Sequence, residues 1–317
     1  MTSKQGHLER TAGDPRESSL HNVIIKQIDE INPSVRVFCL EIPDGGPTIK
    51  FLPGQWLDVY VPTVPKAGGF TITSPPSKAT MPGDGGDDNA RASAAGNGYL
   101  ELAVQKSPDN PPAAWLWQPA TAILHARLDV RVGGSFIWPP AGVQLASLRK
   151  VVLVAGGVGI NPLMSMLSAL AEDLEDSRLS SGLDVRVLYS MKDPGSPRTA
   201  SGMLFVERIT AVFASSAVKG DMKLFLTRGG GDGGGGGGGD GGGGEEDAVS
   251  CCNGFKVPFS RRRIVTGDVE DALGEDKQSS VVYICGVPGM TDEFVEALTS
   301  ADGLSMEPRR VLFEKWW

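Results

Sequence analysis

The chain has 317 residues, of which 40% are hydrophobic and 21% are charged, and its formal net charge is −8. The length favours two domains, and the composition is that of a folded protein with a sizeable core. The acidic balance excludes nucleic acid as the main partner, because phosphate binding needs a basic face.

The cysteines and the apolar runs limit the possibilities further. The four cysteines form no C-x-x-C pair, which predicts neither a metal site nor a disulfide framework and favours a reducing compartment. No run reaches the roughly 18 apolar residues of a membrane span. Residues 1–19 are polar with charges of both signs, so we expect a disordered N-terminus without a clear transit peptide.

The first half of the chain consists of short predicted strands. They lie at residues 23–28, 35–42, 56–61, 70–73, 99–104, 128–132 and 136–138. Turns at short spacing with little helix indicate an antiparallel β-barrel of the Greek-key type over residues 20–147. Residues 75–98 are rich in Gly, Asp, Ser and Ala, and we expect a floppy insertion there.

The pattern changes near residue 148, where strands and helices begin to alternate. Strands are predicted at 151–155, 185–189, 223–226, 281–284 and 311–313, and helices at 163–174, 202–213, 268–273 and 291–298. This alternation indicates a parallel sheet covered on both faces, hence an α/β nucleotide-binding domain over residues 148–317. The glycine tract at 229–244 is interpreted as a flexible loop.

A buried strand, a glycine turn and a helix follow one another at residues 151–174. Backbone amides and a helix N-terminus at such a turn can bind a pyrophosphate, and Gly159 would let the backbone approach it closely. The spacing G-G-x-G-x-x-P differs from G-x-G-x-x-G, so a tight turn without a ligand is the alternative. The predicted cofactor-binding residues here are Ala155, Gly156, Gly157, Val158, Gly159, Ile160, Asn161 and Pro162.

Four segments occur in an order that resembles the ferredoxin–NADP reductase superfamily. They are Pro53-Gly54-Gln55-Trp56, Gly69–Ser74, Ala155–Pro162 and Tyr283–Met290. The resemblance covers about residues 20–317, apart from the two low-complexity segments. It implies an FAD-binding barrel domain followed by an NAD-binding domain, in a protein of the mitochondrion or the cytoplasm.

The resemblance places the flavin motif at Phe70, Thr71, Ile72 and Thr73. In the superfamily an aromatic ring stacks beside the isoalloxazine and a hydroxyl contacts its edge, and these positions fall at Phe70 and Thr71. The arginine that pairs with the diphosphate falls at Gly68, and glycine cannot make that contact. A core phenylalanine in a barrel strand is the alternative.

The second phosphate contact of the superfamily falls at residues 106–117. Asn110 and Pro111 are typical of the N-cap and first residue of a helix. The resemblance therefore implies that the amides of Ala113 and Ala114 face an anion.

The nicotinamide half of the resemblance lies in Tyr283–Met290 and in the C-terminal residues. It implies that Cys285 lies near the nicotinamide C4 and assists hydride transfer, and that Gly286 and Pro288 shape the surrounding loop. The alternative for Cys285 is that it is a small buried hydrophobic residue. The alternative for the C-terminal residues is that they pack as a tail on the barrel. The predicted catalytic residues are Cys285, Glu314 and Trp317, with Trp316 covering the flavin.

The residues after the second α/β strand bear on the choice of cofactor. Ser190 and Lys192 are predicted to bind the nucleotide, but the charge of Asp193 would oppose a 2′-phosphate. We therefore favour NAD(H), with NADP(H) left open.

Two functions are compatible with these features. The resemblance implies a flavin-dependent NAD(P)H oxidoreductase that passes a hydride from nicotinamide to FAD and electrons on to a separate protein or small molecule. The missing arginine at Gly68 favours the alternative, an NAD(H)-binding sensor or scaffold with weak or no flavin binding.

Overall fold

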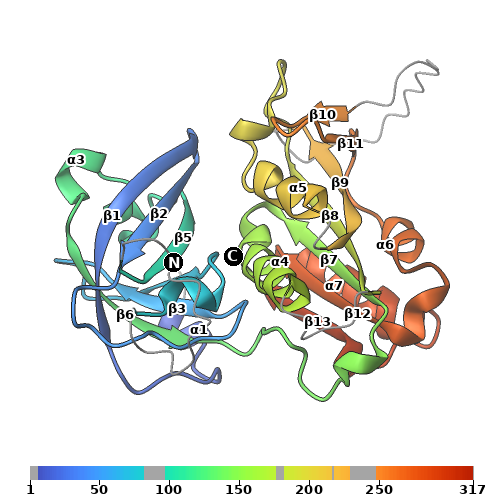
Figure 1. The fold of residues 1–317 in the computed structure, drawn as a ribbon, viewed down its shortest axis with the longest axis horizontal. Coiled ribbons are helices and arrows are strands. Elements are labelled where there is room, and N and C mark those ends of the chain that lie inside the picture. Colours follow the sequence, from blue (N-terminus) through green and yellow to red (C-terminus); the bar gives the residue numbers. More distant parts are fainter. Residues whose placement is uncertain (1–5, 82–96, 176–181, 216–217, 229–247, 317) are drawn as a thin grey trace, which may run out of the picture. The chain divides into compact units, whose positions relative to one another are not determined.

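The computed structural model describes residues 6–81, 97–175, 182–215, 218–228 and 248–316. It divides into two units (Figure 1). The first comprises Met1–Leu145 and Asn161–Leu179, and the second comprises Ala146–Ile160 and Ser180–Trp317. The glycine tract at 229–244 and most of the predicted insertion at 75–98 lie outside the described residues.

Six antiparallel strands form the sheet of the first unit, in the order β4-β3-β6-β1-β2-β5. Alternate residues such as Phe38, Leu57 and Val130 point into one buried core. Just after β4, Ile72 forms an isolated bridge with Leu102 of β5, and the amide of Thr73 donates to the carbonyl of Glu101. In the described part of the chain β4 and β5 themselves are the two end strands of the sheet, so the closed barrel stays a prediction. The strands are β1 (His21–Asn32), β2 (Val35–Glu41), β3 (Trp56–Tyr60), β4 (Gly68–Thr71), β5 (Tyr99–Gln105) and β6 (Arg127–Gly133).

Short helices accompany this sheet, and one long helix belongs to the same unit from Asn161 onward. They are α1 (His7–Arg10), α2 (Pro111–Leu116), α3 (Ala120–Ile123) and α4 (Ile160–Glu175). The Asn161 amide donates to the carbonyl of Ala103 at 2.9 Å, and the Ser165 hydroxyl donates to the carbonyl of Ser74 at 2.7 Å. Two side chains one helical turn apart thus fix α4 to the segments beside β4 and β5.

The predicted strand at 136–138 is wrong. Gly134 has φ +103°, which turns the chain away from the sheet after β6. Phe136 and Trp138 are nevertheless buried, because they pack as loop residues. The apolar spacing therefore reflected burial without strand pairing.

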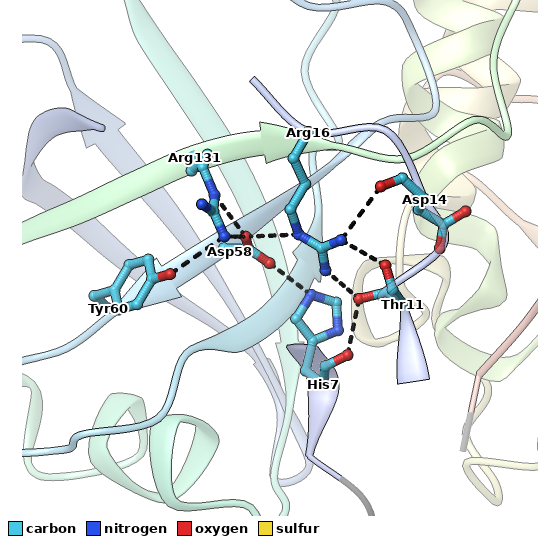
Figure 2. A network of polar contacts seen from close by, with 7 residues as sticks. All are labelled: His7, Thr11, Asp14, Arg16, Asp58, Tyr60 and Arg131. Carbon is cyan, nitrogen blue, oxygen red and sulfur yellow. Dashed lines mark hydrogen bonds and ion pairs between the residues drawn. The ribbon is translucent and has the colours of Figure 1, made fainter. Parts of the chain in front are cut away.

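The prediction of a disordered N-terminus is also wrong from residue 6 onward. Residues 6–17, the N-terminal strap, lie against β3, β4 and β6 (Figure 2). Asp58 is fully buried and accepts hydrogen bonds from His7 (2.9 Å), Arg16 (3.1 Å) and Arg131 (2.6 Å). The His7 ring also meets the Trp56 ring edge-on at 4.8 Å.

The charge of Asp58 explains why the strap is ordered. Burial alone would raise the pKa of this carboxyl, but the hydrogen bonds from His7 and Arg131 and the charge of Arg16 outweigh it and lower the pKa. Among the charges that suggested disorder, that of Arg16 is thus used in a contact with a buried carboxylate.

The second unit holds a mostly parallel sheet in the order β10-β11-β9-β8-β7-β12-β13. Only the hairpin of β10 and β11 is antiparallel among these described pairs. The strands are β7 (Lys150–Gly156), β8 (Asp184–Lys192), β9 (Lys219–Thr227), β10 (Ala248–Ser250), β11 (Lys256–Ser260), β12 (Ser280–Gly286) and β13 (Val311–Lys315). The prediction of an antiparallel sheet followed by a mostly parallel one is confirmed.

Three α-helices lie among the described residues of this unit, namely α5 (Val206–Ala214), α6 (Thr266–Leu273) and α7 (Pro288–Thr299). Residues of α6 and α7 such as Val269 and Phe294 pack against Val152 and Ile284 of the sheet. Helix α5 begins later than the predicted residue 202, because Phe205 has φ +62° immediately before it. No helix in the described part of the chain is long and apolar enough to cross a membrane.

Candidate functional site

The glycine turn joins β7 to α4 through the 3₁₀-helix η3 (Gly157–Gly159). Gly157 has φ +56°, and a Cβ added there would meet no heavy atom within 4 Å. The first amides of a helix have no acceptor within it and carry the positive end of its dipole. The turn therefore combines an open surface with the backbone donors that an anion requires.

Gly159 makes a close approach within the protein, and its predicted approach to a ligand stays a prediction. A Cβ at this position would lie 2.1 Å from the carbonyl oxygen of Cys285. The close approach that needs glycine is thus made to the end of β12, within the protein. At the neighbouring strand ends, a Cβ on Gly286 would lie 3.4 Å from the Cα of Gly156, and Met290 contacts both positions.

Cys285 ends β12 and is fully buried. It is in register with Ala155 of β7 on one side and with Glu314 of β13 on the other. Burial raises the pKa of this thiol strongly, Glu314 raises it further, and a hydrogen bond from Trp316 lowers it without compensating. The side chain is therefore a neutral thiol.

The C-terminal tail is attached to the same strand end. The backbone amide of Trp316 donates to the carbonyl of Gly286 at 2.9 Å, and its indole donates to the carboxylate of Glu314 at 3.0 Å. The structure thus brings Cys285, Glu314 and Trp316 together at the ends of β12 and β13. Trp317 lies outside the described residues.

The sequence did not single out Thr291, which stabilises the loop before α7. Thr291 is fully buried, and its hydroxyl donates to the carbonyl of Val287 at 3.1 Å. Pro288 begins the helix at this point, where its missing N–H has no cost. A buried threonine on a helical pattern looks like any core position, so only the fold reveals this contact.

The end of β8 carries a closed ion pair. Arg198 donates to both oxygens of Asp193, at 2.9 and 2.6 Å, and the amide of Gly195 donates to the same carboxylate at 3.0 Å. These contacts lower the pKa of Asp193 and keep the carboxylate ionised, and the hydrogen bond from Arg198 has the largest effect. Ser190 is half-buried and Lys192 is exposed beside this pair.

The segment that was predicted to contact the flavin, residues 70–73, is buried. Phe70 is 8% exposed, and Thr71, Ile72 and Thr73 are at most 2% exposed. The amide of Thr73 donates to the carbonyl of Glu101, and its hydroxyl donates to the carboxylate of Glu101 at 2.6 Å. A Cβ on Gly68 would lie 2.5 Å from the Phe70 ring and 2.7 Å from Cβ of Pro112.

Helix α2 does not offer the predicted free amides. Asn110 is the N-cap, as predicted, and its side chain accepts from the amide of Ala113 at 3.5 Å. Its carbonyl accepts from the amide of Ala114 at 2.8 Å, while Pro111 and Pro112 have no N–H. Both amides therefore already have acceptors on Asn110, and their contact with an anion stays a prediction.

The described residues consequently do not fit the diphosphate of FAD. The ring of Phe70 fills the space over Gly68, and the N-cap residue Asn110 accepts the hydrogen bonds of the first free amides of α2. The turn of the second unit, in contrast, fits the diphosphate of a nicotinamide nucleotide.

Known proteins resemble the chain over nearly its whole length. The bovine protein named oxidoreductase NAD-binding domain-containing protein 1 is 32% identical over 325 residues, covering 100% of this chain and 88% of that one. No protein-family model matches the chain.

Solved structures resemble it in fold. The FAD/NAD-binding domain of nitric oxide dioxygenase from Vibrio cholerae has a TM-score of 0.60 at 15% identity, covering 93% of this chain and 98% of that domain. A ferredoxin NADP+ reductase from Neisseria gonorrhoeae, with bound FAD and NADP, has a TM-score of 0.61 at 15% identity. The match covers 95% of this chain and 100% of that one. The chain therefore belongs to the oxidoreductase NAD-binding domain-containing protein 1 family, and it shares its fold with these two solved structures.

Proposed function

We propose that this protein is an NAD(H)-dependent oxidoreductase that reduces a flavin. The observation that carries the proposal is the glycine turn, open at Gly157 and packed through Gly159 onto the strand end that holds Cys285. The family supports an oxidoreductase of the reductase class. The electrons would then pass to a separate protein or small molecule.

The second unit would hold the nucleotide through its backbone. The amides of residues 157–159 would bind the diphosphate, because they lie at the start of α4, where the helix dipole favours an anion. Bound NADH would supply a hydride. Gly286 and Pro288 would shape the loop for the nicotinamide. Thr291 would hold that loop in place through its hydrogen bond to the carbonyl of Val287.

Cys285 and Glu314 would act on the nicotinamide end. A neutral, small thiol leaves the site uncharged at that point, whereas Glu314 brings a carboxylate in register beside it. A negative charge there favours the positive charge that develops on a ring losing hydride. Trp316 would hold this carboxylate in one orientation through the 3.0 Å hydrogen bond.

The Asp193–Arg198 pair supports NAD(H) over NADP(H). A 2′-phosphate would meet the charge of Asp193, and Arg198 would have to leave a bidentate partner to reach it. A ribose hydroxyl, in contrast, can donate to a carboxylate.

The experiment compares Gly157→Asp with Gly157→Asn. Both residues tolerate a positive φ and have nearly the same size, but only aspartate adds a charge to the open side of the turn. We expect the dissociation constant for NADH to rise about tenfold or more for aspartate over asparagine. If titration calorimetry gives equal NADH affinities for the two variants, the turn does not belong to the nucleotide site.

The same samples separate the alternative function. The misfit of the FAD diphosphate favours an NAD(H)-binding sensor or scaffold without turnover. Such a protein binds NADH at the turn but leaves added flavin oxidised, as followed by absorbance without oxygen. Bleaching of the flavin band supports the oxidoreductase.

A further inference from the structure

We infer that the flavin is a diffusible substrate that the protein does not hold by its diphosphate. This inference rests on the proposed function and names its substrate class. Riboflavin, FMN and FAD would then all serve as hydride acceptors. The reaction balances as follows: NADH loses the hydride of C4, and the oxidised flavin gains that hydride and one proton from water.

The first support is the space over Gly68. An arginine fork is the usual protein group for a diphosphate, since it donates two parallel hydrogen bonds. Here even a methyl group at residue 68 would lie 2.5 Å from the Phe70 ring and 2.7 Å from Pro112. The ring and the proline therefore occupy the place that a cationic side chain would need.

The second support is the start of α2. A phosphate binds at a helix start through amides that lack partners. The first two residues of α2 are prolines, and the next two amides already donate to Asn110. The helix has six residues, so its dipole is short as well.

The third support concerns the cations beside α2. Arg36 donates to the carboxylate of Glu30 at 2.6 Å and to the carbonyl of Gln118 at 2.7 Å. Its guanidinium lies 4.5 Å from the ring centre of Trp117, and the ammonium of Lys106 lies 5.4 Å from the same ring. Both cations thus lie at the far end of α2 from its prolines.

A cavity in the first unit does not change this conclusion. It has a volume of about 390 Å³ and is lined by Thr48–Phe51 with Pro76, Ser77 and Thr80. None of these residues belongs to β4 or to α2. Strand β4 and helix α2 therefore contribute no residue to the lining of this cavity.

The test measures initial rates of NADH oxidation without oxygen, with riboflavin, FMN or FAD as acceptor, on the full chain after gel filtration. We expect the protein to elute with little flavin and the three KM values to agree within about threefold, roughly 0.7 kcal/mol. Stoichiometric FAD after gel filtration, or a KM for FAD at least about tenfold below that for riboflavin, would overturn the inference.

A variant pair tests the cause. Pro111 is exposed at the start of α2, so Pro111→Lys adds both an amide and a cation there, whereas Pro111→Gln adds the amide alone. We expect lysine to lower the KM for FAD and FMN several-fold relative to glutamine, without affecting riboflavin. An unchanged ratio would oppose the assignment of α2 to the phosphate end. NADH binding without reduction of any flavin would refute the proposed function itself.

Discussion

Replacing Asp58 by asparagine tests whether buried charge holds the N-terminal strap. The substitution keeps the shape but leaves Arg16 and Arg131 without their shared counter-charge, and His7 without a carboxylate partner. Removing one partner of a buried ion pair costs about 3–5 kcal/mol. Because the side chains of Arg16 and Arg131 are 15% and 25% exposed, water can solvate them in part, and we expect about 3 kcal/mol.

Hydrogen exchange followed by mass spectrometry measures this locally. Amides of β3 and of the strap should exchange about a hundredfold faster in the variant, since about 1.4 kcal/mol corresponds to a factor of ten. Peptides of β7 and β12 in the second unit serve as an internal reference. Asp129→Asn is the matched control, because Asp129 is an exposed carboxylate on the neighbouring strand β6. Unchanged protection of β3 in Asp58→Asn would refute the electrostatic explanation.

The sign of the pH dependence gives a second check on Asp58. Its folded-state pKa lies below the usual value, so the folded state binds this proton less readily than the unfolded state. The stabilisation is fully present above an unfolded pKa of about 3.9 and is lost as the pH falls through the folded pKa. The difference between wild type and Asp58→Asn should therefore be constant from neutral pH down to about pH 5 and shrink below about pH 4.

Three further outcomes are expected. Asp193→Asn should release Arg198 and improve the NADPH affinity about tenfold relative to NADH; a constant ratio in fluorescence titrations would contradict the role of this pair. Gly159→Ala should destabilise the second unit by about 3 kcal/mol, because backbone at 2.1 Å cannot yield, whereas Gly157→Ala should cost about 1 kcal/mol in the same exchange experiment. Iodoacetamide should modify the exposed Cys252 before the buried, neutral Cys285; equal labelling rates in peptide mass spectra would argue against a closed strand end.

The nucleotide half was predictable because its signals are local. Val151–Ala155 is an uninterrupted apolar run, the glycines follow it directly, and the helix shows its period within a few residues. The N-terminal strap was missed because its partners are distant in sequence. Asp58 lies 51 residues from His7 and 73 from Arg131, and a mixed-charge segment looks the same whether its charges face water or a buried carboxylate.

The reason for a glycine was harder to predict than its presence. The sequence indicates a turn at residues 156–159, but Gly159 faces the carbonyl of Cys285, which lies on a strand more than a hundred residues later. Only the pairing of β7 with β12 brings these backbones together. Likewise, Asn110 was correctly predicted as a cap, yet its use of both following amides, at 3.5 and 2.8 Å, follows from the geometry of the turn.

The departures from the flavin motif form one connected change. If only the arginine at residue 68 were missing, a hole should remain above Gly68, and the start of α2 should keep free amides. Instead the Phe70 ring and Pro112 fill the space above Gly68, and Asn110 satisfies the helix start that Pro112 belongs to. Packing over Gly68 and capping of α2 are thus both complete without a cation at residue 68.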